Sequence, residues 1–487
     1  IPNPWGTAYD AYGQGFFLHT SGPSVSWMLP GSVNSRYGVS MGAANVLTDH
    51  MMRPTSGLEF VSSRHFPDDI QGDFLMSNCI GFLGAKQHRM IEDGSGFTAK
   101  FRQNLFSSAD TNFRPVDLEF APDGSLYVAD WHNALIGHAQ HNTRDPNRDH
   151  VHGRIYRITY PERPLVIPAK IHGASVGELL ENLKLPEART RYRTRRELRG
   201  RNADEVLPKL KNWVARQSNE QHKLEALWVS WGLNAVDEAL LRELLKSPDH
   251  RVRAAAVQVL RFNIDTIQPH PELLQAAASD AHGRVRLEAI TAASWLNKED
   301  GLAVLQAAAA KPLDRHMTSS HKHALGFLNN EEVIEKQSLF NNINRMKVGL
   351  KGEAWDLFKE GFEIYSREGH CATCHQADGK GLVHAGFPPL DKSEWVTGSK
   401  ERLIKLTLHG LHGPITVKGK DYPGHVPMTA FKDTLSDREI AAVLTYIRNV
   451  YDNQASAVTQ NEVWNVRAAT KDKEGFYNPE QLLKEHP

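Results

Sequence analysis

The sequence predicts a multidomain fold, with β-propeller-like sheets at the N-terminus, α-helical repeats in the middle and a small all-α domain at the C-terminus. Short apolar runs alternate with turn residues in the first third, and a repeated Arg-Val-Arg motif in an alanine-rich background follows. A Cys-X-X-Cys-His motif then precedes an amphipathic helix. Because 487 residues exceed one ordinary domain, we expect these divisions: 1–165, 166–345, 346–452 and a tail over 453–487.

The composition excludes several classes of function. The 57 Lys and Arg residues balance the 57 Asp and Glu residues, so no broad basic field is present that would bind nucleic acid. No apolar stretch reaches the roughly 18 residues that a membrane-spanning helix needs. The chain opens at Ile1-Pro2-Asn3 without a methionine or a basic-then-apolar leader, and we expect a processed protein or a fragment of a longer one.

The first 165 residues are predicted to form β-sheet. Pro122-Asp123-Gly124 is a turn signal before an apolar run, and residues 153–159 alternate as a half-buried strand does. Three stretches begin alike, each leading from proline into an aromatic-rich strand: Asn3–Phe17, Arg53–Phe60 and Arg114–Ala129. A period of roughly 50 to 60 residues is typical of propeller blades, and a closed propeller needs at least about four of them. We therefore expect either missing N-terminal blades or a sheet that closes differently.

The most unusual composition lies between His132 and Arg154, where five histidines alternate with Arg and Asp residues. Histidine suits a general base that takes a proton from an alcohol, and arginine suits the binding of an anionic cofactor. The candidate bases are His65, His138 and His150. The candidate cofactor-binding residues are Arg144, Arg148 and Arg154. The alternative is structural, because arginine–aspartate pairs also hold long loops together.

Residues 166–345 are predicted to form a stack of helical repeats. Arg251-Val252-Arg253 recurs 33 residues later as Arg284-Val285-Arg286, and each copy enters an alanine-rich helix. The pattern resembles HEAT repeats, whose stacking buries the apolar face of each helix pair. We expect a scaffold in which arginines reach acidic residues of the next repeat. Three histidines are interpreted as a solvated helix face, with a metal cluster as the alternative: His316, His321 and His323.

The most specific signal is Cys371-Ala372-Thr373-Cys374-His375. Two thiols at this spacing attach to the vinyl groups of a haem, and the adjacent histidine ligates the iron, so the motif predicts a covalent c-type haem. The alternative is half of a zinc site, which would need two more ligands at matching spacing. The remaining cysteine, Cys79, lies far upstream and is expected to be a small buried residue.

The residues that flank the motif resemble those of a class I cytochrome c, and the resemblance implies that fold. Ser436-Asp437-Arg438-Glu439 begins an amphipathic last helix. Met428, which follows a proline, is the candidate for the second axial ligand, with His425 and His384 as competitors. Histidine–methionine ligation raises the reduction potential relative to bis-histidine ligation, which suits an acceptor of electrons. Helically spaced aromatic residues before the motif are expected to face the last helix: Trp355, Phe358, Phe362 and Tyr365.

Several N-terminal motifs carry a resemblance to a known family. They are Arg53-Pro54-Thr55-Ser56-Gly57, Ser63-Arg64-His65-Phe66-Pro67, Phe113-Arg114-Pro115-Val116-Asp117, Asp130-Trp131 and the run from Arg144 to Arg154. With the order of the three parts, they resemble the planctomycete-type haem-binding CxxCH proteins. That family has a "membrane-bound dehydrogenase-like" propeller, related to sorbosone and soluble quinoprotein glucose dehydrogenases, then helical repeats and cytochrome c.

The resemblance implies a periplasmic or otherwise exported dehydrogenase of a sugar or alcohol. The propeller would hold the substrate with pyrroloquinoline quinone and Ca²⁺, and the cytochrome would pass electrons to a redox partner protein. In quinoprotein dehydrogenases a histidine on the propeller face is the base and arginines bind the quinone. The alternative hypothesis is not enzymatic: the propeller and repeats bind a partner or glycan, and the haem relays electrons between two other proteins.

Overall fold

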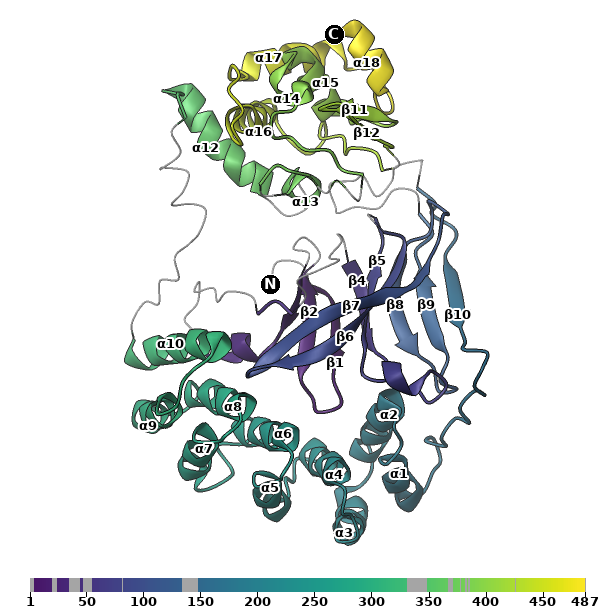
Figure 1. The fold of residues 1–487 in the computed structure, drawn as a ribbon, viewed down its shortest axis with the longest axis vertical. Helices are drawn as coiled ribbons and strands as arrows, with labels where there is room; N and C mark the ends of the chain where they lie inside the picture. The colour runs from purple at the N-terminus through teal and green to yellow at the C-terminus, as the bar shows by residue number, and fades with distance from the viewer. Residues whose placement is uncertain are drawn as a thin grey trace.

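The computed structural model shows three successive parts of the chain, coloured from purple to yellow in Figure 1. It describes residues 4–19, 24–34, 44–46, 55–80, 82–133, 148–330, 348–366, 371–376, 378–381, 383, 386–424 and 426–486. Antiparallel sheets come first, helices follow along one side of them, and a second helical domain ends the chain. Within these residues no helix is both long and apolar enough to cross a membrane.

The N-terminal part consists of three antiparallel sheets in which each strand pairs with the next one along the chain. The sheet orders are β1-β2-β3, β4-β5-β6-β7 and β8-β9-β10. The strands are β1 (Pro4–Tyr9), β2 (Gly15–His19), β3 (Ser24–Trp27), β4 (Thr55–Phe60), β5 (Phe74–Asn78), β6 (Gly84–Asp93), β7 (Gly96–Ser107), β8 (Pro115–Phe120), β9 (Leu126–Asp130) and β10 (Arg154–Ile158). The connections contain two 3₁₀ helices, η1 (Leu29–Ser32) and η2 (Asp68–Ile70).

The first strands of the three sheets lie side by side, with β4 next to both β1 and β8. Glycine permits this approach: a Cβ at Gly6 would lie 2.8 Å from the main-chain oxygen of Ser56, and a Cβ at Gly57 would lie 2.5 Å from the Cα of Asp117. Each sheet begins within one of the three repeated stretches. The described strands form no closed propeller, since three sheets are too few for a ring. Of the predicted propeller, the structure therefore shows the coarser feature, an N-terminal region of antiparallel β-sheets.

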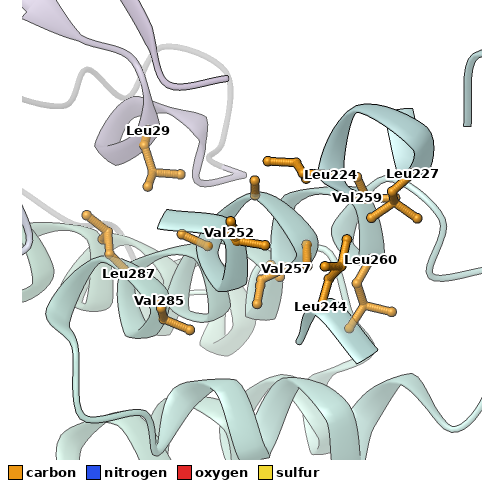
Figure 2. Packing of buried hydrophobic residues seen from close by; sticks show 14 of the residues in the cluster. Leu29, Leu224, Leu227, Leu244, Val252, Val257, Val259, Leu260, Val285 and Leu287 are labelled. Carbon is orange, nitrogen blue, oxygen red and sulfur yellow. The ribbon is translucent and has the colours of Figure 1, made fainter. Parts of the chain in front are cut away.

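The middle part is a stack of helices whose apolar faces form one continuous core, shown in Figure 2. The same core includes Phe16 and Trp27 of the first sheet, so the sheets and helices share one apolar interior. The helices are α1 (Val176–Asn182), α2 (Ala188–Arg199), α3 (Ala203–Val214), α4 (Glu220–Gly232), α5 (Glu238–Leu244), α6 (His250–Arg261), α7 (His270–Ala278), α8 (Gly283–Ala293), α9 (Lys298–Ala309) and α10 (Arg315–Asn329).

The two arginines of each Arg-Val-Arg motif point to different neighbours. Arg253 donates to both carboxylate oxygens of Asp280 at 2.8 and 2.9 Å, which confirms the predicted link between repeats. Arg284 instead faces the sheets: it is buried, donates to the main-chain oxygen of Ser95 at 3.2 Å and lies 3.9 Å from the centre of the Phe97 ring. The repeats therefore hold the sheets with charged and cation–π contacts as well as apolar ones.

Glu92, His250 and His282 meet at the same seam between sheets and helices, with one potential ligand atom each within 4.8 Å of the others. These groups already have structural partners. Nδ1 of His282 accepts the main-chain N–H of Arg284 at 3.2 Å, Arg284 donates to Glu92 at 2.8 Å, and the two imidazole rings stack with centroids 3.6 Å apart. A metal would have to displace the first of these contacts, so the cluster serves to close the seam.

The three histidines of α10 do not form the predicted solvated face. His316 and His323 are buried, and the ring of His316 packs edge-on against Trp27 with centroids 5.6 Å apart. His321 lies with Nε2 3.1 Å from the main-chain oxygen of Leu305. The metal alternative also fails, because none of them joins a metal-binding set in the described part of the chain. The prediction was wrong because Trp27 of the first sheet covers His316 and α9 holds His321.

The C-terminal part has a core of its own. Its elements are α12 (Glu353–Ser366), α13 (Cys371–His375), α14 (Glu394–Thr397), α15 (Lys400–His409), β11 (Ile415–Val417), β12 (Lys420–Tyr422), α16 (Asp437–Asn449), α17 (Gln460–Ala469) and α18 (Pro479–Glu485). The predicted tail belongs to this core, since Val463 of α17 and Leu482 of α18 are completely buried in it. Nε2 of His409 also lies 2.8 Å from the Thr470 hydroxyl, which links α15 to the residue after α17.

The predicted packing of α12 against the last amphipathic helix, α16, is present. Gly361 of α12 sits where the helices cross, and a Cβ there would overlap the main-chain oxygen of Ala442. Three aromatic rings of α12 have centroids 5.2 to 5.7 Å from that of Tyr446: Phe358, Phe362 and Tyr365. This crossing fixes α12 immediately before the Cys-X-X-Cys-His segment.

Replacing Gly361 by alanine is expected to destabilise the C-terminal domain by about 2–3 kcal/mol, because the added methyl group must push two helices apart. The matched control is Gly177→Ala in α1, where a Cβ meets no atom within 4 Å. That change should be neutral or stabilise by up to about 1 kcal/mol, since alanine favours helix more than glycine. Thermal and urea unfolding measure both, and equal stability of the two variants would contradict this packing.

Candidate functional site

A deep pocket lies in the C-terminal domain, with walls from α13, the segment 386–390, α15, α16 and residues 426–431. Most of its lining side chains are apolar, and its volume is about 190 Å³. Because its lining is mostly apolar, the pocket suits an apolar occupant.

Helix α13 brings all three chemical groups of the Cys-X-X-Cys-His motif to this pocket, since Cys371, Cys374 and His375 line it. A hydrogen bond from α12 holds the end of this helix. The Tyr365 hydroxyl donates to the main-chain oxygen of Gln376 at 2.6 Å, and Tyr365 itself packs in the crossing of α12 and α16. The helix crossing therefore determines where the motif lies.

The chain turns back immediately after the motif and places a proline carbonyl beside the histidine. Gly381 donates its N–H to the main-chain oxygen of His375 at 3.0 Å and has a φ of 70°. A Cβ at Gly381 would lie 2.5 Å from the main-chain oxygen of Pro388, so the turn requires glycine. Nδ1 of His375 lies 2.9 Å from that same Pro388 oxygen and, as the ring's N–H, donates to it.

This hydrogen bond prepares His375 to ligate a metal through its other nitrogen. Burial lowers the pKa of His375, and the bond to Pro388 offsets only part of that effect, so the imidazole is neutral at pH 7. A neutral ring that donates through Nδ1 keeps the Nε2 lone pair for a metal. Iron ligation requires this tautomer.

The geometry excludes the zinc alternative within the described residues, because no further ligand joins the motif to complete a zinc set. Burial also raises the pKa of the Cys371 thiol to about 12. Two thiols on the wall of an apolar pocket instead suit thioether bonds to a porphyrin.

Met428 lines the same pocket and is half-buried against the domain core. Its main chain is held by Leu411: the N–H of Met428 donates to the Leu411 oxygen at 2.8 Å, and the Leu411 N–H donates back at 3.4 Å. The thioether is thus supplied by a fixed segment. The competing ligands His425 and His384 lie outside the described residues.

His65, predicted as a candidate base, is buried with both ring nitrogens engaged by the main chain. Nδ1 lies 3.0 Å from the Pro164 oxygen, and Nε2 accepts the N–H of Tyr160 at 2.8 Å. The ring holds the segment after β10 against the turn after β4. A general base needs a nitrogen that is open to substrate, so this geometry favours a structural role.

The other predicted residues of the His132–Arg154 segment are dispersed. His138 and Arg144 lie outside the described residues, Arg148 is buried and His150 is exposed. Arg154 donates from Nε to Asp130 at 2.6 Å and from Nη1 to Asp110 at 2.8 Å. Its Nη2 is buried and makes no hydrogen bond in the described structure.

The structure brings together three residues that sequence reasoning did not select. Nδ1 of His152 lies 2.9 Å from Oδ2 of Asp149, and Nε2 of His132 lies 3.6 Å from the same oxygen. Main-chain N–H groups of Val151 and His152 lower the pKa of Asp149, and the His152 ring adds to this. His132 has a φ of 51°, an uncommon conformation for a side chain of its size. Asp149 accepts the main-chain N–H groups two and three residues ahead of it, which is an Asx turn. The sequence signal for such a turn at Asp149 could have identified His152 as its neighbour.

Three protein-family models match the chain, one in each part. Residues 2–162 match a domain of unknown function (DUF7133), residues 236–326 match HEAT repeats, and residues 358–451 match cytochrome c. The HEAT match confirms the predicted repeats. The N-terminal match names neither a propeller nor a dehydrogenase.

The curated relatives share the C-terminal domain. Cytochrome c-552 of Thermus thermophilus is 37% identical over 130 residues, which cover 26% of this chain and 93% of the relative. The cytochrome c subunit of a quinone alcohol dehydrogenase from Gluconobacter oxydans is 34% identical over 109 residues, which cover 22% of each chain. The corresponding subunit from Komagataeibacter europaeus is 32% identical over 109 residues, again 22% of each chain. With a cytochrome matched over nearly its whole length, this chain belongs to the cytochrome c family through its C-terminal domain.

Proposed function

We propose that this chain is an exported electron-transfer protein that carries one covalent haem c between His375 and Met428. The observation that supports it most strongly is the hydrogen bond from His375, in α13, to the main-chain oxygen of Pro388. Two thiols and a neutral, oriented imidazole lie on one wall of an apolar pocket, and Met428 is part of the same lining. When bound, the haem iron supplies reversible one-electron redox chemistry.

Each residue of the pocket has a separate task. Cys371 and Cys374 would hold the porphyrin, His375 would ligate the iron through Nε2, and Met428 would offer its thioether as a further ligand. The apolar lining excludes water and favours the less charged, reduced iron. With both residues as ligands, the haem would supply one-electron transfer and leave no open position for substrate. Because c-type haem is attached after export, the proposed location is the periplasm or another extracytoplasmic compartment.

The axial role of Met428 is tested by Met428→Ala. The oxidised wild-type protein should show the weak red charge-transfer absorption of methionine bound to ferric haem, and the variant should lack it. Loss of the thioether should also lower the reduction potential by on the order of 0.1 V. Met90→Ala is the matched control, since Met90 is also half-buried but lies in β6. If Met428→Ala keeps the absorption, Met428 is not the ligand. If the wild type lacks the absorption, His425 or His384 is favoured as the ligand.

The proposed source of the electrons is oxidation of a sugar or alcohol in the N-terminal β-sheet region. The three sheets have their first strands side by side, as propeller blades do, and so are proposed to be part of a larger propeller. The His132, Asp149 and His152 cluster supports a base: Asp149 accepts from Nδ1 of His152, which leaves Nε2 of that exposed ring open to solvent. The buried Nη2 of Arg154 is a free donor for an anionic group.

Pyrroloquinoline quinone and Ca²⁺ are the cofactors proposed for this oxidation. Arg154 fits an anionic quinone, with Arg148 and Arg144 as further candidates and His150 and His138 as further bases. The described residues here offer no set of converging ligands for Ca²⁺. Oxidation of an alcohol to a carbonyl releases two electrons and two protons, so each substrate molecule would reduce the haem twice, with re-oxidation by a redox partner protein between the steps.

The alternative proposal is a relay without its own substrate, in which the sheets and repeats dock a partner. It is favoured by the structural use of His65 and by the two ion pairs of Arg154. Both proposals keep the haem as the electron carrier.

Anaerobic mixing of the oxidised protein with pyrroloquinoline quinone, Ca²⁺ and a panel of sugars and alcohols decides between them. The dehydrogenase proposal predicts haem reduction, seen in the visible spectrum, by at least one compound. His152→Asn should slow that reduction at least tenfold, since general bases contribute roughly 10²–10⁴-fold. His172→Asn, in an exposed turn, should leave the rate unchanged. No reduction across the panel would favour the relay.

A further inference from the structure

The haem pocket is lined by residues of the N-terminal sheets as well as by the C-terminal domain. Trp5 of β1 and the pair Cys79 and Ile80, directly after β5, belong to its wall. In Figure 1 the sheets and the C-terminal domain face each other, with α13 on the side of the domain nearest the sheets. The pocket is therefore completed by residues that precede the Cys-X-X-Cys-His motif by 291 to 366 positions.

Both contributing segments are firmly placed in the sheet region. Trp5 is followed by Gly6, whose close approach to Ser56 joins β1 to β4. Cys79 is completely buried. Its neighbours Arg114 and Ser56 offset part of the rise that burial causes in the pKa of its thiol. The wall is thus built where the first strands of the three sheets converge.

The chemistry of this wall suits a haem edge. An indole, an isoleucine and a thiol are the contributing groups, and burial raises the pKa of Cys79 to about 12, so the thiol is uncharged. Trp5 is 40% exposed, which is unusual for so large an apolar ring and leaves surface available to an occupant of the pocket. An uncharged wall removes water from the haem without adding charge, and this favours the reduced iron.

We propose that Trp5 and Ile80, with the buried Cys79 behind them, form a built-in cover over the haem edge, which raises the reduction potential of the haem. The inference rests on the proposed haem c in this pocket. It adds that the edge faces the chain's own N-terminal region, so a small reductant in solution has restricted access to it. Trp5 is a positioning and shielding residue rather than a catalytic one.

The test compares Trp5→Ala, Trp5→Phe and Trp464→Ala in the full chain with bound haem. Trp464 lies on α17 of the same domain as the haem, is 60% exposed and does not line the pocket. Trp5→Ala should lower the reduction potential in a spectroelectrochemical titration and accelerate reduction of the oxidised haem by ascorbate. Trp5→Phe should remain close to the wild type, and Trp464→Ala should match it.

A second substitution, Ile80→Ala, should change both quantities in the same direction as Trp5→Ala. If both alanine variants keep the wild-type reduction potential and the wild-type rate of reduction by ascorbate, the proposed cover is wrong. That outcome is distinct from failure of the proposed function, which would appear as absence of covalent, methionine-ligated haem in the wild type. The visible spectrum of each variant shows that the axial ligands are unchanged.

Discussion

The hydrogen bond from His375 Nδ1 to the Pro388 oxygen is the interaction on which the functional part of this protein depends. It selects the tautomer that leaves Nε2 for iron, and it can form only because the chain reverses at Gly381. The α12–α16 crossing at Gly361 then sets the position of α13 through Tyr365. Local backbone chemistry and long-range helix packing thus converge on one imidazole, and the apolar pocket around it supplies the dry environment that tunes a haem.

The helical repeats contribute rigidity rather than chemistry. The buried Arg284 ties α8 to the turn between β6 and β7, and a shared apolar core continues from the helices into the first sheet. Because β1 and β5 are fixed in this way, Trp5 of β1 and Cys79, which follows β5, can form part of the wall of the haem pocket. The C-terminal domain has a separate core. The wall of the haem pocket is therefore where the N-terminal sheets contribute to the proposed function of that domain.

Sequence reasoning was most successful where the signal is local. The Cys-X-X-Cys-His spacing, the aromatic stripe of α12 and the Arg253–Asp280 link all follow from neighbouring residues and periodicity. It failed where tertiary contacts decide, because His316 is buried against Trp27 of a distant sheet. Tertiary contacts also hold the His65 ring at Pro164 and Tyr160 and place α17 and α18 in the C-terminal core, and no local pattern shows this. Trp5 and Cys79 carry no local signal for a haem pocket, since only the folded chain brings them to it.

The central claim is that Cys371 and Cys374 hold one haem covalently, with His375 as its ligand. The most direct test is the intact mass and denatured visible spectrum of the full chain, purified after export from a bacterium that matures c-type cytochromes. The account predicts a mass increase of one haem per chain and haem colour that stays with the polypeptide after acid extraction. It also predicts that a Cys371→Ala, Cys374→Ala double variant loses both. A wild-type chain whose haem extracts freely, or that carries none, would contradict the account.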